Sequence, residues 1–164
     1  MMGVGKSTVG RIVAKNLNLK FIDTDFNIEK KNSMKISEIF KKKGEKFFRQ
    51  EEEIEVLKSL KLNKSVIALG GGAFMNKKVR DSVLKNCISF WLDLNIKTIN
   101  KRIKWNKRRP LAIGENALEK VKKLYLERKN TYKLAKYKIN CNNLTKENIV
   151  KKIIFFYEQN EINN

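Results

Sequence analysis

Residues 1–10 read MMGVGKSTVG, and the segment Gly3-Val4-Gly5-Lys6-Ser7-Thr8 within them decides the fold. It matches the second half of the phosphate-binding loop G-x-x-x-x-G-K-[ST]. In that loop, backbone N–H groups and a lysine hold nucleotide phosphates, while a serine or threonine hydroxyl binds Mg²⁺. A helix that starts here adds its partial positive charge. The first glycine of the motif and the strand before it are not in the sequence, so a chance turn before a helix is the alternative.

Composition limits the classes of protein to which the chain can belong. A chain of 164 residues with 41% hydrophobic residues suits one domain. No apolar run approaches the roughly 20 residues of a membrane span, and the N-terminus does not resemble a signal peptide. We therefore expect a cytoplasmic protein with no membrane partner. The chain has no histidine, which excludes histidine triads and histidine zinc sites, so a general base must be a carboxylate or, less readily, a lysine.

The net charge of +20 favours polyanionic partners. However, 30 of the 37 basic residues are lysines spread along the whole chain, without an arginine-rich arm or a helix-turn-helix signature. We therefore predict no nucleic-acid partner. Where lysine is the default, each arginine is a candidate for a position that needs a planar, bidentate donor. The seven arginines are Arg11, Arg49, Arg80, Arg102, Arg108, Arg109 and Arg128.

Two carboxylates follow the first expected strand. Residues 6–17 have helical spacing of apolar residues, and the strand in residues 20–25 ends with Asp23 and Asp25. Ligands bind at this edge of an open α/β sheet. Two acids on one side of a strand can divide the work at a magnesium phosphate site, one near the metal and one receiving a hydroxyl proton. The alternative is that Thr24 or Asp25 caps the next helix.

A charged pair lies on the long helix expected at 45–62, which follows shorter helices within 26–43 and a break at Gly44. Arg49 and Glu52 are three residues apart and share a helix face. One interpretation is a weak surface ion pair. The other is an arginine that glutamate holds toward a substrate carboxylate.

A buried strand at 66–69 runs into Gly70, Gly71 and Gly72. These glycines indicate either a flexible turn or, as we favour at this edge, a close approach of backbone to ligand. Later elements are expected as helix 76–86, strand 88–92, helix 95–105 with Arg102, helix 117–136 with Arg128, strand 137–141 and helix 145–157. The basic loop at 104–116 contains Arg109 and is expected to be a lid over phosphates, or otherwise a connector.

Alternating strands and helices predict one three-layer α/β domain over 1–164, with a parallel sheet. The sequence resembles the shikimate kinase family of P-loop kinases. The resemblance covers residues 1 to about 136. It rests on MMGVGKSTVGRIVAKNL, FIDTDFNIE, ISEIFKKKGEKFFRQEE, VIALGGGAF, RRPL and LYLERKNTYKLA, and the ordered set D-T-D, F-R-x-x-E, G-G-G, R-P-L and R-x-x-x-Y is its specific part.

The resemblance implies ATP-dependent phosphorylation of the 3-hydroxyl of shikimate, a step toward chorismate and the aromatic amino acids. The cofactors it implies are ATP and Mg²⁺, and the only partner is the small-molecule substrate, bound by a monomer. The implied phosphate loop is Gly3, Val4, Gly5, Lys6, Ser7 and Thr8. Lys6 would contact the transferring phosphate, and Ser7 with Asp23, through water, would hold Mg²⁺. Asp25 would bind the attacking hydroxyl as the base.

The substrate-binding segment implied by the resemblance is about 25–62. Arg49 and Arg128 would hold the shikimate carboxylate, while Glu52 and Gly70 to Gly72 shape the pocket. Arg109 would be the lid arginine on the phosphates, and Arg102 would stack near adenine. Asn140 and Cys141 stand where the family commonly has an acidic residue, which leaves the adenine loop open.

The family's sheet has the strand order 2-3-1-4-5, and its first strand is missing here. Strands three and four then lack a neighbour, and their backbone groups face a gap. We expect that the true start lies upstream and that this chain is poorly folded and nearly inactive. Adding about ten apolar-rich residues should restore both properties, and equal melting temperature and turnover would refute this.

Two other functions remain open from the sequence. One is phosphorylation of another small molecule, such as gluconate or a nucleoside monophosphate, by a related P-loop kinase. The other is a catalytically impaired basic module that only binds nucleotide.

Overall fold

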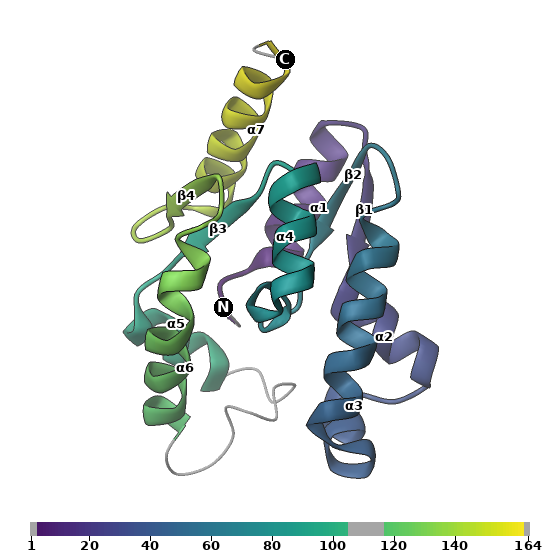
Figure 1. Cartoon of the computed structure of the whole chain (residues 1–164). Coiled ribbons are helices and arrows are strands. Elements are labelled where there is room, and N and C mark those ends of the chain that lie inside the picture. The colour runs from purple at the N-terminus through teal and green to yellow at the C-terminus, as the bar shows by residue number, and fades with distance from the viewer. Residues whose placement is uncertain (1–2, 105–116, 163–164) are drawn as a thin grey trace.

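The computed structural model of the chain describes residues 3–104 and 117–162. Most of the expected lid, including Arg109, lies outside the described residues. Strands and helices alternate, as expected (Figure 1). The elements are α1 (Lys6–Asn16), β1 (Lys20–Asp23), α2 (Thr24–Asn32), α3 (Ile36–Ser59), β2 (Ser65–Ala68), the 3₁₀ turn η1 (Ala73–Met75), α4 (Lys77–Asn86), β3 (Phe90–Asp93), α5 (Ile96–Lys104), α6 (Ala117–Tyr132), β4 (Tyr137–Asn140) and α7 (Lys146–Ile162).

The four strands form two parallel pairs. Phe21 of β1 is in register with Val66 of β2, and Trp91 of β3 is in register with Lys138 of β4. Within residues 3–104 and 117–162, no strand lies hydrogen-bonded between β2 and β3. The arrangement therefore contains the two parallel pairs at the ends of the predicted order, and it confirms the expected α/β fold.

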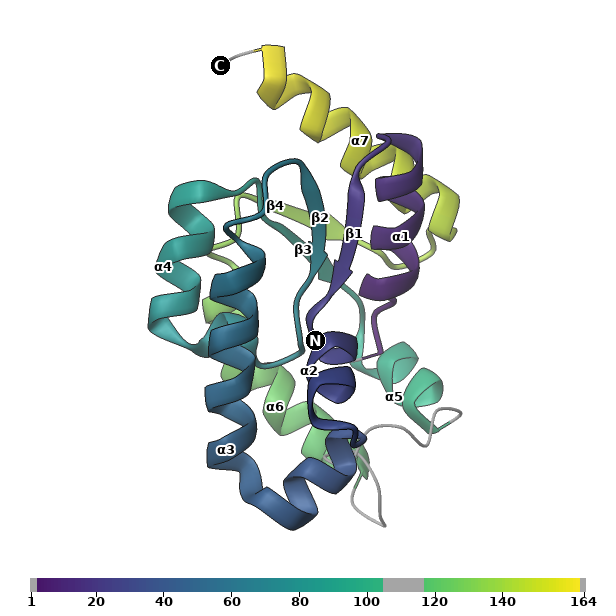
Figure 2. The same cartoon turned by 90° about the vertical axis from the view of Figure 1, so that its right-hand side faces the viewer.

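Helices join the two strand pairs. Val9 and Val13 on α1 are one helical turn apart and both are buried. α1 packs on β1, on β2 and on α7. Trp91 and Leu92 of β3 belong to the same apolar cluster as these valines, so one core reaches both pairs. In Figure 2 the strands stand between α4 on one side and α1 with α7 on the other, which gives the three layers.

The α2–α3 pair has a small core of its own. Ile28, Ile39 and Phe48 form a separate buried cluster. The predicted break in α3 occurs at Gly44, whose φ of 82° and ψ of 168° are not helical. The positive φ favours glycine, and the bend folds the start of α3 back toward α2. This arm corresponds to the expected substrate-binding segment, and it extends from the strands as Figure 1 shows.

The two aspartates after β1 lie differently from the sequence prediction. β1 ends at Asp23, and Asp25 lies in the first turn of α2 rather than on a strand. The cap of α2 is Asp23, not Thr24 or Asp25, because its Oδ1 accepts a hydrogen bond from the N–H of Phe26 at 3.2 Å. The predicted common strand face is therefore wrong. A helix begins at Thr24 because Asp23 satisfies one of its free N–H groups.

In the described part of the chain, no helix combines the length and apolar character needed to cross a membrane.

Candidate active site

The phosphate-binding segment has the backbone that its glycines permit. Gly3 and Gly5 have φ values of 73° and 94°, which are left-handed conformations. Lys6 then opens the 11-residue helix α1. Val4 between the glycines is 2% exposed and so anchors the loop in the core. The loop thus stands at a helix N-terminus, where backbone N–H groups and the helix dipole favour anions.

Arg102 of α5 lies against this loop. Its Nη1 donates to the carbonyl of Val4 at 3.4 Å, and a Cβ at Gly5 would lie 4.0 Å from the same nitrogen. The sequence predicted a place for Arg102 at the nucleotide. The structure brings the side chain to the phosphate loop, and its stacking on adenine stays a prediction.

Thr24 fastens the end of β1 to the glycine turn after β2. Its side chain is fully buried. The hydroxyl donates to the carbonyl of Ala68 at 3.3 Å and accepts from the N–H of Gly70 at 3.0 Å. Since α2 starts at Thr24, these bonds fix the first turn of α2, including Asp25, relative to the turn.

Gly70 allows two carboxylates to converge. A Cβ at this position would lie 2.5 Å from Oδ1 of Asp25 and would clash with Oε1 of Glu52 as well. Because real Cβ atoms essentially never approach other atoms that closely, a side chain at this position would require both carboxylates to shift. Glu52 is 3% exposed, and its Oε1 has no hydrogen-bond partner among the described residues.

Arg49 is held by two glutamates of its own helix. Its Nη1 donates to Oε2 of Glu52 at 2.7 Å, and its Nε and Nη2 donate to Oε1 of Glu45 at 3.1 Å and 2.9 Å. The pair with Glu52 is thus buried at one end, unlike the surface ion pair that was the alternative interpretation. Burial disfavours the charge on Arg49, but Glu52 and Glu45 outweigh it and raise the pKa of the guanidinium.

For Glu52, burial raises the pKa of the carboxyl group. Arg49 opposes this shift, whereas the nearby charge of Asp25 adds to it. The desolvation of a carboxyl that is almost wholly inside the protein outweighs one ion pair.

Arg128 is fixed from the opposite side of the site. It is 7% exposed, and its Nη1 donates to the carbonyl of Gly71 at 2.7 Å. The hydroxyl of Tyr132 donates to the same carbonyl at 2.5 Å. Arg128 and Tyr132 are four residues apart on α6 and therefore on one face. The glycine turn thus positions Arg128 by its backbone.

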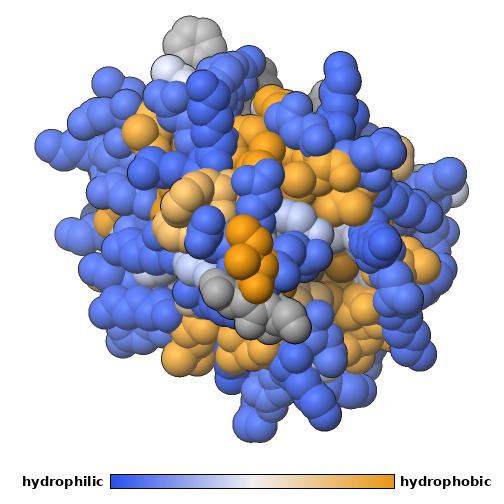
Figure 3. All heavy atoms as spheres, turned by 90° about the horizontal axis from the view of Figure 1, so that it is seen from above, coloured by the Kyte–Doolittle hydropathy of each residue, from blue (hydrophilic) through white to orange (hydrophobic). Residues whose placement is uncertain are grey.

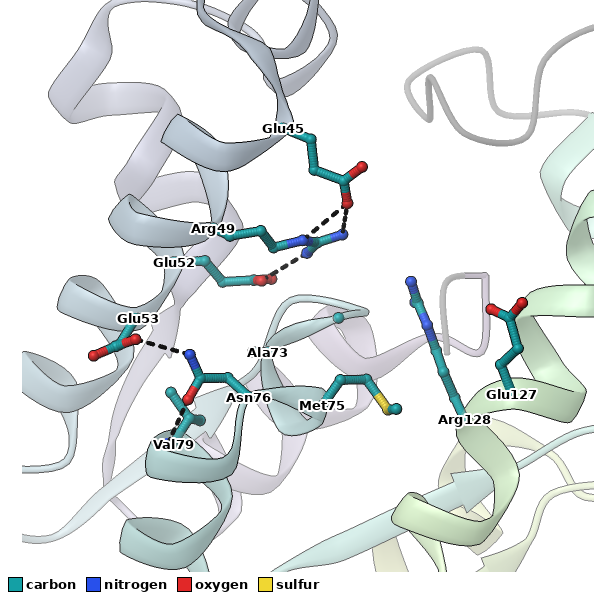
Figure 4. Close-up of a pocket in the computed structure, with 11 residues that line it drawn as sticks. Glu45, Arg49, Glu52, Glu53, Ala73, Met75, Asn76, Val79, Glu127 and Arg128 are labelled. Carbon is teal, nitrogen blue, oxygen red and sulfur yellow. Dashed lines mark hydrogen bonds and ion pairs between the residues drawn. The ribbon is translucent and has the colours of Figure 1, made fainter.

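A cavity of about 420 Å³ separates the two arginines. In Figure 4, Arg49 approaches from α3 and Arg128 from α6, and their guanidinium groups face the same space. The lining residues are Glu45, Arg49, Glu52, Glu53, Gly72, Ala73, Met75, Asn76, Val79, Glu127 and Arg128. Asp25 is not in this lining but reaches Gly70 from the adjacent side. The structure therefore brings together Asp25, Arg49, Glu52, the three glycines and Arg128.

Magnesium needs few protein ligands at such a site. Groups of three or more carboxylate, cysteine or histidine side chains that could hold a metal are absent from the part of the chain that the structure describes. Mg²⁺ is commonly held by one or two protein oxygens together with substrate phosphates. The hydroxyl of Ser7 on the first turn of α1 and the carboxylate of Asp23 at the end of β1 fit that chemistry.

Three residues were given no role at the site from the sequence, although Thr24 and Tyr132 stand in the D-T-D and R-x-x-x-Y motifs. Glu45 lies one turn before Arg49, and Tyr132 lies one turn after Arg128, so helical spacing could have indicated both. Thr24 gave no such signal, because its two partners come from a distant strand end.

The comparisons with known proteins agree with this geometry. Residues 2–158 match the family described as shikimate kinase. The shikimate kinase of Sulfurihydrogenibium sp. (strain YO3AOP1) is 41% identical over 153 residues, which are 93% of this chain and 91% of that protein. The shikimate kinase from Acinetobacter baumannii in complex with shikimate has a TM-score of 0.93 at 32% identity, covering 97% of this chain and 89% of that one. The shikimate kinase from Aquifex aeolicus vf5 has a TM-score of 0.86 at 30% identity, covering 100% and 96%.

Proposed function

Since the chain belongs to the shikimate kinase family, and is therefore an enzyme that phosphorylates shikimate with ATP, we propose how its own residues divide that work. The observation that carries the proposal is the meeting of two arginines and two carboxylates at one glycine turn. Arg49 and Arg128 face a common cavity (Figure 4), and Asp25 and Glu52 converge on Gly70.

Arg49 and Arg128 bind the carboxylate of shikimate. Guanidinium groups suit this task because their planar N–H groups match a carboxylate and stay charged. The bond from Arg128 to the carbonyl of Gly71 sets the direction of one arginine before substrate arrives. Glu52 does the same for the other. The related structure that contains shikimate supports a small-molecule ligand of this kind.

Asp25 receives the proton of the attacking hydroxyl. A carboxylate is the available type of base in a chain without histidine. Asp25 lies in the first turn of α2, and its carboxylate is beside Gly70, two residues from Gly72 in the lining of the carboxylate-binding cavity, which supports this role. Lys6 contacts the transferring phosphate. Arg109, which is not among the described residues, is the lid arginine that binds the phosphates.

The segment from Gly3 to Thr8 binds the phosphates of ATP, with Arg102 close to the nucleotide. Ser7 would hold Mg²⁺, and Asp23 would do so through water. The metal supplies positive charge that offsets charge on the phosphates. We propose that the enzyme works as a cytoplasmic monomer without a nucleic-acid or membrane partner.

Two sets of variants test these roles. Asp25→Asn should lower kcat by orders of magnitude while ATP still binds, whereas a protein that only binds nucleotide would show no such change. Arg49→Lys and Arg128→Lys should each raise the KM for shikimate more than the KM for ATP, because an ammonium cannot form the bidentate contact. Unchanged KM for shikimate in both lysine variants would remove the two arginines from the site.

A further inference from the structure

Arg49, which we assign to the substrate carboxylate, is already hydrogen-bonded to Glu45. Oε1 of Glu45 accepts hydrogen bonds from both Nε and Nη2 of Arg49, the side of the guanidinium that suits a carboxylate. Glu52 takes only Nη1. The two glutamates differ in burial, since the side chain of Glu45 is 58% exposed and that of Glu52 is 4% exposed. Glu45 can therefore move away into water, whereas Glu52 cannot.

The cavity is acidic in a chain that is strongly basic. Its lining contains four glutamates, Glu45, Glu52, Glu53 and Glu127, against two arginines, although the chain as a whole has a net charge of +20. Glu53 accepts hydrogen bonds from the side chains of Asn76 and Lys78. Glu45 is the acid that touches the exposed side of Arg49 (Figure 4). A small anion that approaches Arg49 thus meets this negative charge first.

We propose that Glu45 competes with incoming anions for Arg49 and so weakens anion binding at this site. A ligand must displace Glu45 from Nε and Nη2, or bind beside its charge. Shikimate can compensate through its hydroxyl groups, which sulfate lacks, while Arg128 lines the same cavity and is available to both anions. Glu45 therefore lowers the affinity for every anion and reduces the occupancy of the site by sulfate or phosphate. This inference rests on the proposed role of Arg49.

The size of the effect follows from the exposure of the pair. An ion pair between exposed side chains changes an equilibrium by up to about fivefold. The KM for shikimate should therefore fall by about twofold to fivefold when the charge of Glu45 is removed. Since salt screens exposed charges, the difference from the unchanged enzyme should shrink as the concentration of a weakly binding salt rises.

The experiment compares Glu45→Gln with Glu51→Gln. Glutamine keeps an oxygen that can accept from Arg49 but carries no charge, so the variant separates repulsion from positioning. Glu51 is on the same helix, pairs with Lys31 at 2.9 Å and does not line the cavity. Glu51→Gln has the same net charge as Glu45→Gln, so it controls for the loss of one negative charge outside the cavity. KM for shikimate, KM for ATP and the inhibition constant for sulfate against shikimate are measured for both variants and for the unchanged enzyme.

Glu45→Gln should lower the KM for shikimate and the inhibition constant for sulfate, with the KM for ATP unchanged and with Glu51→Gln indistinguishable from the unchanged enzyme. A higher KM for shikimate in Glu45→Gln would mean that Glu45 orients Arg49, and it would overturn the inference, as would no change. The Arg49→Lys variant distinguishes a failure of the proposed substrate site from a failure of the competition by Glu45. If it leaves the KM for shikimate unaltered, the proposed site itself fails, whereas an altered KM there with no effect of Glu45→Gln rejects only the competition.

Discussion

Gly70 is a position where space, and not backbone conformation, requires glycine. The carboxylates of Asp25 and Glu52 occupy the region that a Cβ would need. An alanine would force both carboxylates to shift, and Glu52 has little room to do so because it is buried. Displacing a reacting group by about 1 Å can lower activity by about 100-fold. We expect Gly70→Ala to reduce kcat/KM for shikimate by about that factor.

The measurement for Gly70→Ala is steady-state kinetics with shikimate and with ATP varied in turn, beside a thermal melt. The KM for ATP should change little, since the phosphate loop is formed by another segment. A variant with unaltered kcat/KM for shikimate would show that the carboxylates do not need their present positions.

The free energy of unfolding should depend on the protonation of Glu52, and protonated Glu52 should favour the folded protein. Burial, despite Arg49, raises its pKa in the folded protein above the ordinary value of 4.5. A raised pKa means that the folded chain holds this proton more tightly than the unfolded chain. The contribution to stability is therefore complete below the ordinary pKa and is lost as pH rises through the folded pKa. Glu52→Gln, which resembles the protonated acid, removes this dependence.

Urea unfolding of both proteins at several values between about pH 4 and 7 tests this sign. The two should have similar stability at the acidic end, and the glutamine variant should gain relative to the unchanged protein toward neutral pH. A relative gain of the unchanged protein with rising pH would mean that attraction to Arg49 outweighs burial.

At the scale of residues, scarcity was a useful signal and distance in sequence was the limit. Arginine is rare in this lysine-rich chain, and this alone marked Arg49 and Arg128 as candidates before any contact was known. Glu45 remained one acid among many because a helix face does not say which pair will bond. The sequence offered Thr24 only as a helix cap, and its two contacts could not be predicted, since its partners Ala68 and Gly70 are more than 40 residues away.

Among the secondary-structure elements, the end of β1 is connected to the turn after β2 through the side chain of Thr24. Replacing its hydroxyl by a methyl group in Thr24→Val leaves the Ala68 carbonyl and the Gly70 N–H without this buried partner. Such a loss costs about 1–3 kcal/mol. Thr24→Ser keeps the hydroxyl and removes only the methyl group, which costs about 1 kcal/mol when a small cavity is left.

Unfolding in urea should therefore rank the proteins as unchanged, Thr24→Ser and Thr24→Val in order of falling stability. If the valine variant were at least as stable as the serine variant, the two hydrogen bonds would not hold the elements together.

The order and type of the elements followed from apolar spacing, but several of their ends did not. For example, α6 ends at Tyr132 and not at 136, and α7 continues to Ile162 and not only to 157. The break at Gly44 was predicted because glycine interrupts a helical pattern, and the structure confirms it with a left-handed φ. The end of β1 was placed too late. The sequence D-T-D continues a strand as readily as it caps a helix, and the hydrogen bond from Phe26 to Asp23 decides in favour of the cap.

The whole molecule is a layered fold built on two separate strand pairs in the described residues. The gap between β2 and β3 was predicted from the family order, and within the described residues the two pairs do not bond to one another. The sequence could not show how the pairs would stay associated. They do so through side chains, since α1 contacts β1, β2 and α7, and one apolar cluster includes residues of both pairs.

Net charge acts on the molecule as a whole. The chain has 37 basic and 17 acidic side chains, and hydrophilic residues cover much of the face in Figure 3. Repulsion within such a charge distribution destabilises the compact state, and salt reduces it because the screening length falls from about 30 Å at 0.01 M to about 8 Å at 0.15 M. The melting temperature should therefore rise by several degrees between about 20 and 300 mM sodium chloride.

A variant of two adjacent exposed lysines separates this repulsion from anion binding at the phosphate loop. Lys41 and Lys42 are exposed on α3, far in sequence from Gly3 to Thr8, and the change to glutamine at both removes two positive charges while keeping good helix formers. The double variant should melt at a higher temperature than the unchanged protein in low salt, and the difference should narrow as salt increases. If instead the melting temperature of the unchanged protein fell with added salt, attractive ion pairs such as Lys31–Glu51 and Arg49–Glu52 would outweigh the excess of like charge in stabilising the fold.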